Sequence, residues 1–125
     1  MKKKEQSMKR LKVYISGKVT GLDPEYMRQK FAKTEEWLRS LGFDTVNPET
    51  LVPAGVESWE EAMKICLRAE LDCDLLFAQS DAYESKGARV EISVAASLKI
   101  HVIHEDGGLA TEKLLDLIGE QKRAS

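Results

Sequence analysis

Residues 81–91 read DAYESKGARVE and join two segments of different pattern. The continuous apolar run before them, residues 75–78, is typical of a strand covered on both faces of a parallel sheet. Residues 90–98 after them have the apolar spacing of a helix. We therefore predict a strand-to-helix turn at the carboxyl end of a central strand, where ligands bind in open parallel sheets.

This turn carries the residue types that bind anions. Ser85, Lys86, Gly87 and Arg89 lie where the helix is expected to begin, and Asp81 lies at the exit of the strand. A helix N-terminus offers free backbone N–H groups and a partial positive charge, which suit a phosphate. Lys86 and Arg89 also have the i, i+3 spacing of a solvated helix face, so for these two the ligand-facing and solvent-facing interpretations stay open.

Glu91 is the first candidate for chemistry. With Val94, Ala95 and Leu98 it forms an i, i+3, i+4, i+7 set, the core-facing stripe of a helix. A carboxylate on a buried stripe is expected to have a hydrogen-bond or ion-pair partner, or a functional role. The alternative is an exposed glutamate that complements the helix dipole, with the stripe displaced by one position.

Length and composition indicate one small globular domain. The 125 residues are 42% hydrophobic and 32% charged, with a formal net charge of −2. This balance gives no general attraction to polymeric nucleic acid or to membranes, so neither is expected as a partner and any anion site must be local. We predict a disordered basic tail at residues 1–10, a single domain at residues 11–120 and a flexible tail at residues 121–125.

The cysteines and the N-terminal residues predict a cytoplasmic protein. No cofactor is expected. Residues 1–10 lack the apolar stretch of a signal peptide, and no run approaches transmembrane length. Cys66 and Cys73 are expected to be reduced thiols. His101 and His104 are expected at the surface, and no His/Cys spacing indicates a metal site.

The order of the predicted elements determines the fold class. Strands are expected at residues 11–16, 43–46, 73–79 and 100–103, and helices at residues 26–41, 58–71, 90–98 and 109–119, with Ser58 as an N-cap. The alternation predicts an α/β three-layer sandwich with a parallel sheet of four or five strands in the order 2-1-3-4. This order places the loop after the first strand beside the turn at residues 81–87.

The loop after the first strand supplies a second group of candidates. Gly17 and Gly21 either relieve strain in the turn or allow close approach of a ligand, with Ser16, Lys18 and Thr20 as donors. The spacing is neither that of a dinucleotide-binding motif nor that of a P-loop.

Asn47 and Trp59 are candidates with equally ordinary alternatives. Asn47 ends the second strand and either contacts the ligand or forms the turn before Pro48. Trp59 either stacks on a base or packs the loop at residues 51–56.

A phosphate near Gly87 would bring an attached sugar one helical turn further, to Glu91. A carboxylate beneath an anomeric carbon can act as a nucleophile or stabilise an oxocarbenium ion, and Tyr14 could orient it. The predicted reaction is cleavage of the N-glycosidic bond of a nucleotide.

Two segments resemble a known superfamily. YISGKVTG, residues 14–21, is similar to the first-strand signature of the nucleoside 2-deoxyribosyltransferase superfamily, and Ser85, Gly87 and Glu91 are similar to its serine-glycine-glutamate segment. This superfamily includes the 2′-deoxynucleoside 5′-phosphate N-hydrolases. With Asn47-Pro48 and Ser58-Trp59-Glu60 the pattern looks more like an uncharacterised, mostly bacterial and phage branch, over residues 13–103.

The resemblance implies a flavodoxin-like fold and roles for several residues. It implies Glu91 as covalent nucleophile, Tyr14 as its orienting partner and Ser85 as a phosphate ligand, in a homodimer or larger homo-oligomer whose sites are completed by a neighbouring subunit. The chain departs from the superfamily at Thr20, where the hydrolases carry an arginine, and at Cys66, where the enzymes carry an aspartate that helps protonate the leaving base.

The sequence features are compatible with three functions to different degrees. The first is a nucleotide N-glycosidase or deoxyribosyltransferase that uses Glu91. The second is a module that binds a nucleotide or related phosphorylated ligand without turnover, which Thr20 and Cys66 favour. The third, a receiver-like interaction domain, is disfavoured because no acidic cluster follows the first strand. Fold class alone does not distinguish them.

Overall fold

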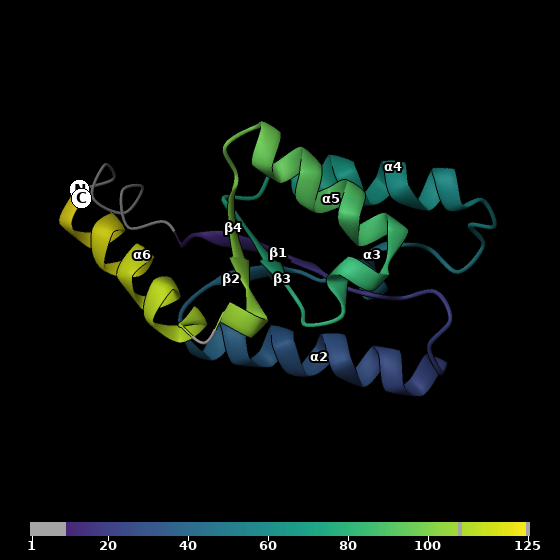
Figure 1. The fold of residues 1–125 in the computed structure, drawn as a ribbon, viewed down its shortest axis with the longest axis horizontal. Coiled ribbons are helices and arrows are strands. Elements are labelled where there is room, and N and C mark those ends of the chain that lie inside the picture. The colour runs from purple at the N-terminus through teal and green to yellow at the C-terminus, as the bar shows by residue number, and fades with distance from the viewer. Residues whose placement is uncertain (1–9, 108, 125) are drawn as a thin grey trace.

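The computed structural model describes residues 10–107 and 109–124 and shows a sheet between two layers of helices (Figure 1). The strands of this described part are β1 (Lys12–Ser16), β2 (Asp44–Val46), β3 (Leu75–Ala78) and β4 (His101–His104). The helices are α2 (Pro24–Ser40), α3 (Pro48–Leu51), α4 (Trp59–Glu70), α5 (Lys86–Ser97) and α6 (Ala110–Ala124), with 3-10 turns η1 (Ala82–Glu84) and η2 (Glu105–Gly107).

The sheet topology confirms the predicted fold class. All neighbouring strands pair in parallel, in the order β2-β1-β3-β4, so the chain is a flavodoxin-like α/β protein. The first and third strands lie at the centre of the sheet, in a register that pairs Tyr14 with Leu76 and Ser16 with Ala78. Their carboxyl ends, with the loops that follow, therefore lie side by side as expected.

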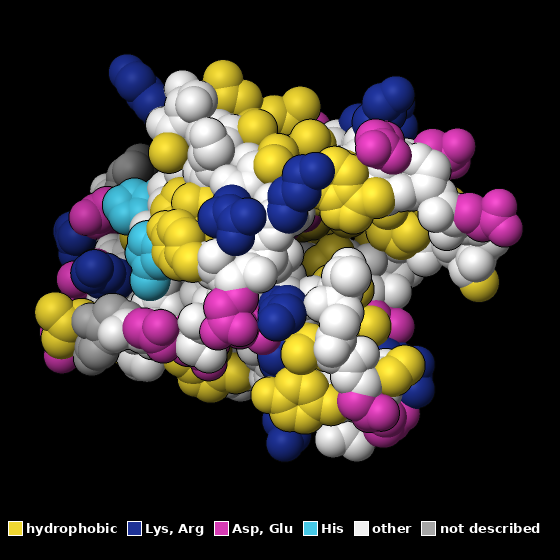
Figure 2. Space-filling model, turned by 45° about the vertical axis from the view of Figure 1, so that its right-hand side comes forward, with side chains coloured by type: hydrophobic (Ala, Val, Ile, Leu, Met, Phe, Trp, Pro, Cys, Tyr) yellow, Lys and Arg dark blue, Asp and Glu magenta, His cyan; other side chains and the backbone are white. Residues whose placement is uncertain are grey.

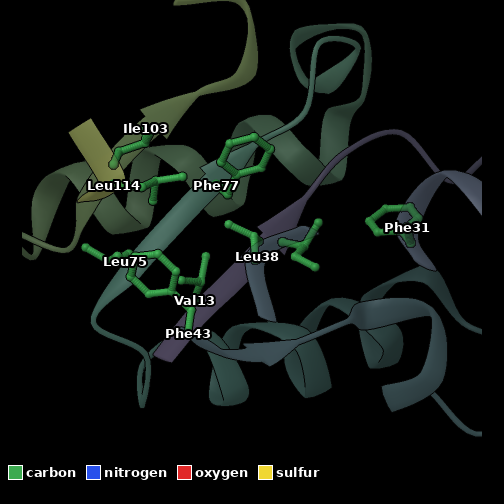
Figure 3. Close-up of a cluster of buried hydrophobic side chains, with 9 residues drawn as sticks. Val13, Phe31, Leu38, Phe43, Leu75, Phe77, Ile103 and Leu114 are labelled. Atoms are coloured by element: carbon green, nitrogen blue, oxygen red, sulfur yellow. The ribbon is translucent and has the colours of Figure 1, made fainter. Parts of the chain in front are cut away.

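One face of the sheet forms the larger hydrophobic core (Figure 3). Val13 and Ile15 of β1 alternate with residues of the opposite face, because successive side chains of a strand point to opposite sides. They pack with Leu75 and Phe77 of β3. The helices α2 and α6 cover this face and contribute Phe31, Leu38 and Leu114.

The other face is covered by α4 and α5 and contains smaller side chains. Tyr14 and Leu76 point to this side and pack with Cys66 of α4 and with Ala88 and Ala95 of α5. The alanines let α5 approach the sheet closely. The polar groups Ser16 and Glu91 are buried on the same side.

The helices differ from the predictions most clearly at α5, α3 and α6. Helix α5 begins at Lys86, before the expected position, because the Ser85 hydroxyl caps it by accepting a hydrogen bond from the Ala88 N–H (3.2 Å). The short helix α3 was not predicted, because four residues are too few for a periodic pattern. Helix α6 continues through Gly119 to Ala124, so residues 121–124 are helical and not a flexible tail.

The predicted disordered tail at residues 1–10 lies outside the described residues except for Arg10. The Arg10 Nε donates a hydrogen bond to the Gly42 carbonyl oxygen (3.0 Å). Within the described ranges, no helix is both long enough and apolar enough to cross a bilayer.

Candidate active site

Glu91 is held by two hydroxyl groups of β1. The Tyr14 hydroxyl donates to Glu91 Oε2 at 2.6 Å, and the Ser16 hydroxyl donates to Glu91 Oε1 at 2.7 Å. Tyr14 and Ser16 are two residues apart on a strand, so both point to the α5 side of the sheet. Both carboxylate oxygens are therefore fixed in the second turn of α5.

Burial determines the ionisation of this group. Glu91 is 5% exposed, and burial raises the pKa of its carboxyl group, while the hydrogen bonds from Tyr14 and Ser16 oppose that rise. No ion pair among the described residues includes Glu91. Burial and the nearby Glu91 charge also raise the pKa of Tyr14, so the phenol stays protonated and remains a donor.

Glu91 lies at the inner end of a cavity of about 240 Å³. The wall is mostly apolar, and side chains from the loop after β1, from α2, from α3 with the residue after it, and from α4 line it: Val19, Met27, Pro48, Val52, Trp59 and Met63. Cys66, Ser85 and Gly87 line it beside Glu91. In Figure 2 a hollow right of centre has hydrophobic side chains at its base and lysine or arginine side chains on its upper rim.

A second, open hollow adjoins the cavity at the N-terminus of α5. Thr20, Trp59, Ser85 and Gly87 line both spaces, and Lys86 lines the outer one. The Lys86 Nζ lies 4.4 Å from the centre of the Trp59 ring, which is a cation–π contact. An anion in the outer hollow would meet the free N–H groups of the helix and the Lys86 ammonium group, and also the carboxylates of Glu60 and Glu84, which line the same space.

Two glycines are required by close packing beside the cavity. A Cβ atom at Gly17 would collide with Oε1 of Gln79. A Cβ atom at Gly87 would lie 3.1 Å from the Met63 Sδ and 3.7 Å from the Trp59 Nε1. Both glycines therefore let backbone approach its neighbours where the cavity is formed.

The structure brings eight of the predicted site residues to this region. They are Tyr14, Ser16, Gly17, Trp59, Ser85, Lys86, Gly87 and Glu91. Of the predicted apolar stripe around Glu91, Ala95 is buried, whereas Leu98 is 57% exposed at the end of α5.

Asp81 and Lys18 have other contacts. The Asp81 carboxylate accepts hydrogen bonds from the Lys18 N–H (3.0 Å) and from the Lys30 Nζ (2.9 Å). The Lys18 Nζ is directed to Glu84, at 3.5 Å. Neither side chain lines the cavity, and their contacts instead fasten the loop after β1 to α2 and to the turn after β3.

Asn47, Arg89 and Gly21 are also placed away from the cavity lining. The Asn47 side chain caps α3 by accepting from the Glu49 N–H (2.9 Å). The Arg89 Nη1 donates to the Tyr83 carbonyl oxygen (2.8 Å). Gly21 has a φ of +90°, and a Cβ atom added there would meet nothing within 4 Å, so the glycine is explained by the turn conformation.

Several residues of the site were not predicted. Met27, Pro48, Val52 and Met63 read as ordinary core or loop residues in the sequence, and nothing in their spacing indicates a cavity. Glu70, at the end of α4, is fully buried, and burial together with the Glu91 charge raises its pKa to about 8. The sequence feature that could have indicated its burial is that Glu70 lies four residues after Cys66, because residues with this spacing share one face of a helix.

The cysteines of the described chain are free thiols, and burial raises the pKa of Cys66. The described residues contain no group of three or more His, Cys, Asp or Glu side chains that could hold a metal ion.

Comparisons with known proteins support the fold. A search of curated proteins found no match. A solved structure, "Crystal structure of conserved protein from Enterococcus faecalis V583", is similar with a TM-score of 0.62 and 18% sequence identity over 94% of this chain and 100% of that chain. The sequence pattern of the family described as "Domain of unknown function (DUF4406)" matches residues 11–104, which comprise the whole sheet and the cavity. The chain therefore belongs to the DUF4406 family.

Proposed function

We propose that this protein cleaves the bond between the base and the sugar of a nucleotide, with Glu91 as nucleophile. The observation that carries the proposal is a buried carboxylate held by the Tyr14 and Ser16 hydroxyls at the inner end of an apolar cavity. The resemblance of residues 14–21 and 85–91 to nucleoside 2-deoxyribosyltransferases supports the same reaction.

The ligand would span both hollows. Its phosphate binds at the N-terminus of α5, with Ser85 and Lys86, and its base lies among the apolar side chains of the inner cavity. Trp59, which lines both spaces, offers a face on which a base can stack.

The reaction proceeds in two displacements. A Glu91 oxygen forms a bond to the anomeric carbon as the carbon–nitrogen bond breaks, and the electron pair leaves with the base, which takes up a proton from solvent. A water molecule, or a second base in a transferase, then attacks the anomeric carbon, gives up a proton to solvent and releases the carboxylate. The Tyr14 and Ser16 hydrogen bonds keep Glu91 oriented for both steps.

Cys66 supports a second candidate, a binding module without turnover. It lines the cavity beside Glu91, and burial raises the pKa of its thiol above an already high ordinary value. A thiol of this kind is a weak proton donor to a leaving base. Without an effective acid, a bound nucleotide would stay intact.

The proposal also includes a second copy of the chain. Hydrophobic side chains that line the cavity are partly exposed, with Val19 41% and Trp59 38% accessible. Such a rim fits a homodimer in which a neighbouring subunit completes each site. Analytical ultracentrifugation of the full chain tests this part: a monomer at all concentrations would contradict it.

The decisive experiment measures release of free base from a panel of ribo- and deoxyribonucleotides by chromatography. Glu91→Gln removes the nucleophile with little change in shape, and Glu36→Gln, an exposed glutamate on the opposite layer, is the matched control. We expect release by the wild type and by Glu36→Gln and none by Glu91→Gln.

Two other outcomes separate the alternatives. No release, with a higher melting temperature in the presence of a nucleotide, would reject catalysis and leave the binding module. Neither release nor a change in melting temperature would overturn both candidates.

A further inference from the structure

Glu70 is a buried carboxyl group without a partner. Its side chain is 0% exposed, and neither Oε1 nor Oε2 accepts or donates a hydrogen bond. No ion pair of the described chain includes it. An unpaired buried carboxylate is among the least favourable groups in a protein interior, so this group is expected to retain a proton.

Glu70 belongs to the same buried region as the candidate active site. It lies one helical turn beyond Cys66 on α4, and Cys66 lines the cavity beside Glu91. Helix α4 packs against α5, which carries Glu91, and the Glu91 charge raises the pKa of Glu70. Glu70 is not part of the cavity lining, so it acts on a ligand only through other residues.

The groups around Glu70 contain little positive charge. The titratable groups that face this region from the packed elements are Tyr14 of β1, Cys66 of α4, Cys73 after α4 and Glu91 of α5. Lys12, Asp72 and Asp74 act on Cys73 at the outer edge. None of the four groups Tyr14, Cys66, Cys73 and Glu91 carries a positive charge.

The surroundings of the two carboxyl groups differ in one decisive respect. Glu91 accepts two hydrogen bonds from hydroxyl groups, which stabilise its charged form. Glu70 accepts none. When two interacting acids have such different surroundings, the charge resides on the hydrogen-bonded member and the proton on the other.

We propose that Glu70 and Glu91 form a coupled carboxyl pair in which Glu70 holds the proton and Glu91 holds the single negative charge at neutral pH. Glu70 is thus a positioning residue that acts on the proposed nucleophile through its own ionisation. Its ionisation in alkaline solution places a second buried charge beside Glu91, which weakens binding of an anionic nucleotide. This catalytic consequence rests on the proposed function, whereas the pairing itself does not.

A purely structural role predicts the opposite response to mutation. A side chain kept for packing should destabilise the fold when it is replaced. Glu70 places an unsatisfied polar group in the interior, so Glu70→Leu should raise the melting temperature at neutral pH. A lower melting temperature for both Glu70→Leu and Glu70→Gln would assign Glu70 to the structure and overturn the proposal.

The pairing is tested by NMR titration of the glutamate carboxyl carbons in the full chain. We expect a wild-type resonance that titrates near pH 8, is absent from Glu70→Gln and moves to lower pH by about one unit or more in Glu91→Gln. Titration of Glu70 in the ordinary range, or a Glu70 titration that Glu91→Gln leaves unchanged, would overturn the pairing. If Glu70→Gln does not fold, Glu70→Leu identifies the resonance.

The catalytic consequence is tested on the same variants by the pH dependence of base release. The wild type should lose activity above about pH 8, mainly through a higher KM, and Glu70→Gln should not show this alkaline loss. A coupled titration without any base release would reject the proposed function and retain the pair. Base release with an ordinary Glu70 titration would reject the pair alone.

Discussion

At the scale of the residue, the chemistry of Glu91 is determined by the hydroxyl groups of Tyr14 and Ser16. They compensate a buried carboxylate that has no cation partner in the described chain, and they fix both of its oxygens. A lysine or arginine in their place would neutralise the charge and weaken Glu91 as the proposed nucleophile. Two neutral donors instead leave the negative charge available to a ligand.

Tyr14→Phe should impair both stability and turnover. It removes the 2.6 Å hydrogen bond, and leaving a buried acceptor short of a partner costs about 1–3 kcal/mol of unfolding free energy. Because that bond lowers the Glu91 pKa, its loss should raise this pKa and move the acid limb of the pH–rate profile to higher pH. Urea unfolding and base release across the acid range measure the two effects.

Tyr83→Phe is the control for this substitution. The Tyr83 ring is 56% exposed, and its hydroxyl contacts the His104 Nε2 at the surface (2.8 Å). We expect little change in either measurement. Equal effects of the two substitutions would show that the Tyr14 hydroxyl has no special relation to Glu91.

At the scale of the element, the loop between β1 and α2 is held in place by groups that do not line the cavity themselves. Gly17 packs against Gln79, and Asp81 binds both the Lys18 N–H and the Lys30 ammonium group. The loop carries Val19 and Thr20 to the cavity wall. Its position therefore determines the shape of the mouth.

Gly17→Ala should displace this loop. The added Cβ would collide with Gln79 Oε1, and overpacking of this kind costs about 1–3 kcal/mol of unfolding free energy. Gly55→Ala is the matched control, because a Cβ at Gly55 meets nothing within 4 Å. Urea unfolding of both variants measures the difference; a Gly17→Ala variant as stable as Gly55→Ala would contradict the packing.

Asp81→Ala should loosen the same loop by removing its ion pair. The Lys30 and Asp81 side chains are only 14% and 19% exposed, so the loss leaves a largely buried ammonium group and should cost about 2 kcal/mol. Glu25→Ala breaks the exposed pair with Arg28 and should have no measurable effect. Thermal unfolding compares them, and similar melting temperatures would refute a role for Asp81 in holding the loop.

The sequence predicts strands and helices well where the apolar periodicity is strong. It does not predict which way the side chain of a loop residue points. The run at residues 75–78 and the alternation of residues 12–16 predicted the central strands, and the spacing around Glu91 predicted its burial. The sequence did not indicate that Asp81 contacts Lys18 and Lys30, because a loop residue has no period that shows which way its side chain points. For Arg89 it left both the ligand-facing and the solvent-facing interpretation open. Glu70 was missed because a glutamate in the last turn of a helix ordinarily points to solvent.

At the scale of the whole molecule, the sheet separates two kinds of interior. The α2 and α6 side contains large hydrophobic residues, whereas the α4 and α5 side contains the cavity and the buried acids. The two buried glutamates, Glu70 and Glu91, both lie on this second side. Such a division makes the stability of the protein depend on pH.

The free energy of unfolding should fall as the pH rises from about 4.5 to about 8. Folded Glu70 keeps its proton up to about pH 8, whereas the unfolded chain loses it near the ordinary value of 4.5. In this window the native state binds more protons, so stability falls by up to about 1.4 kcal/mol per pH unit. The stabilisation that protonated Glu70 gives to the folded state is fully present below pH 4.5 and is lost above pH 8.

Urea unfolding at intervals across this window measures the slope for the wild type and Glu70→Gln. The variant should show a shallower slope, with the remainder coming from Glu91, whose pKa is also raised. Identical slopes for the two proteins would show that the proton whose binding is coupled to folding is held by a group other than Glu70.

The two tryptophans of the chain lie in different layers and are therefore separate optical probes. Trp37 packs against Phe77 with ring centres 5.6 Å apart, while Trp59 is 38% exposed at the cavity mouth beside Lys86. Trp37→Phe leaves an emission that reports occupancy of the cavity, and Trp59→Phe leaves one that reports unfolding of the core. Intrinsic fluorescence can thus follow ligand binding and folding independently, without a label.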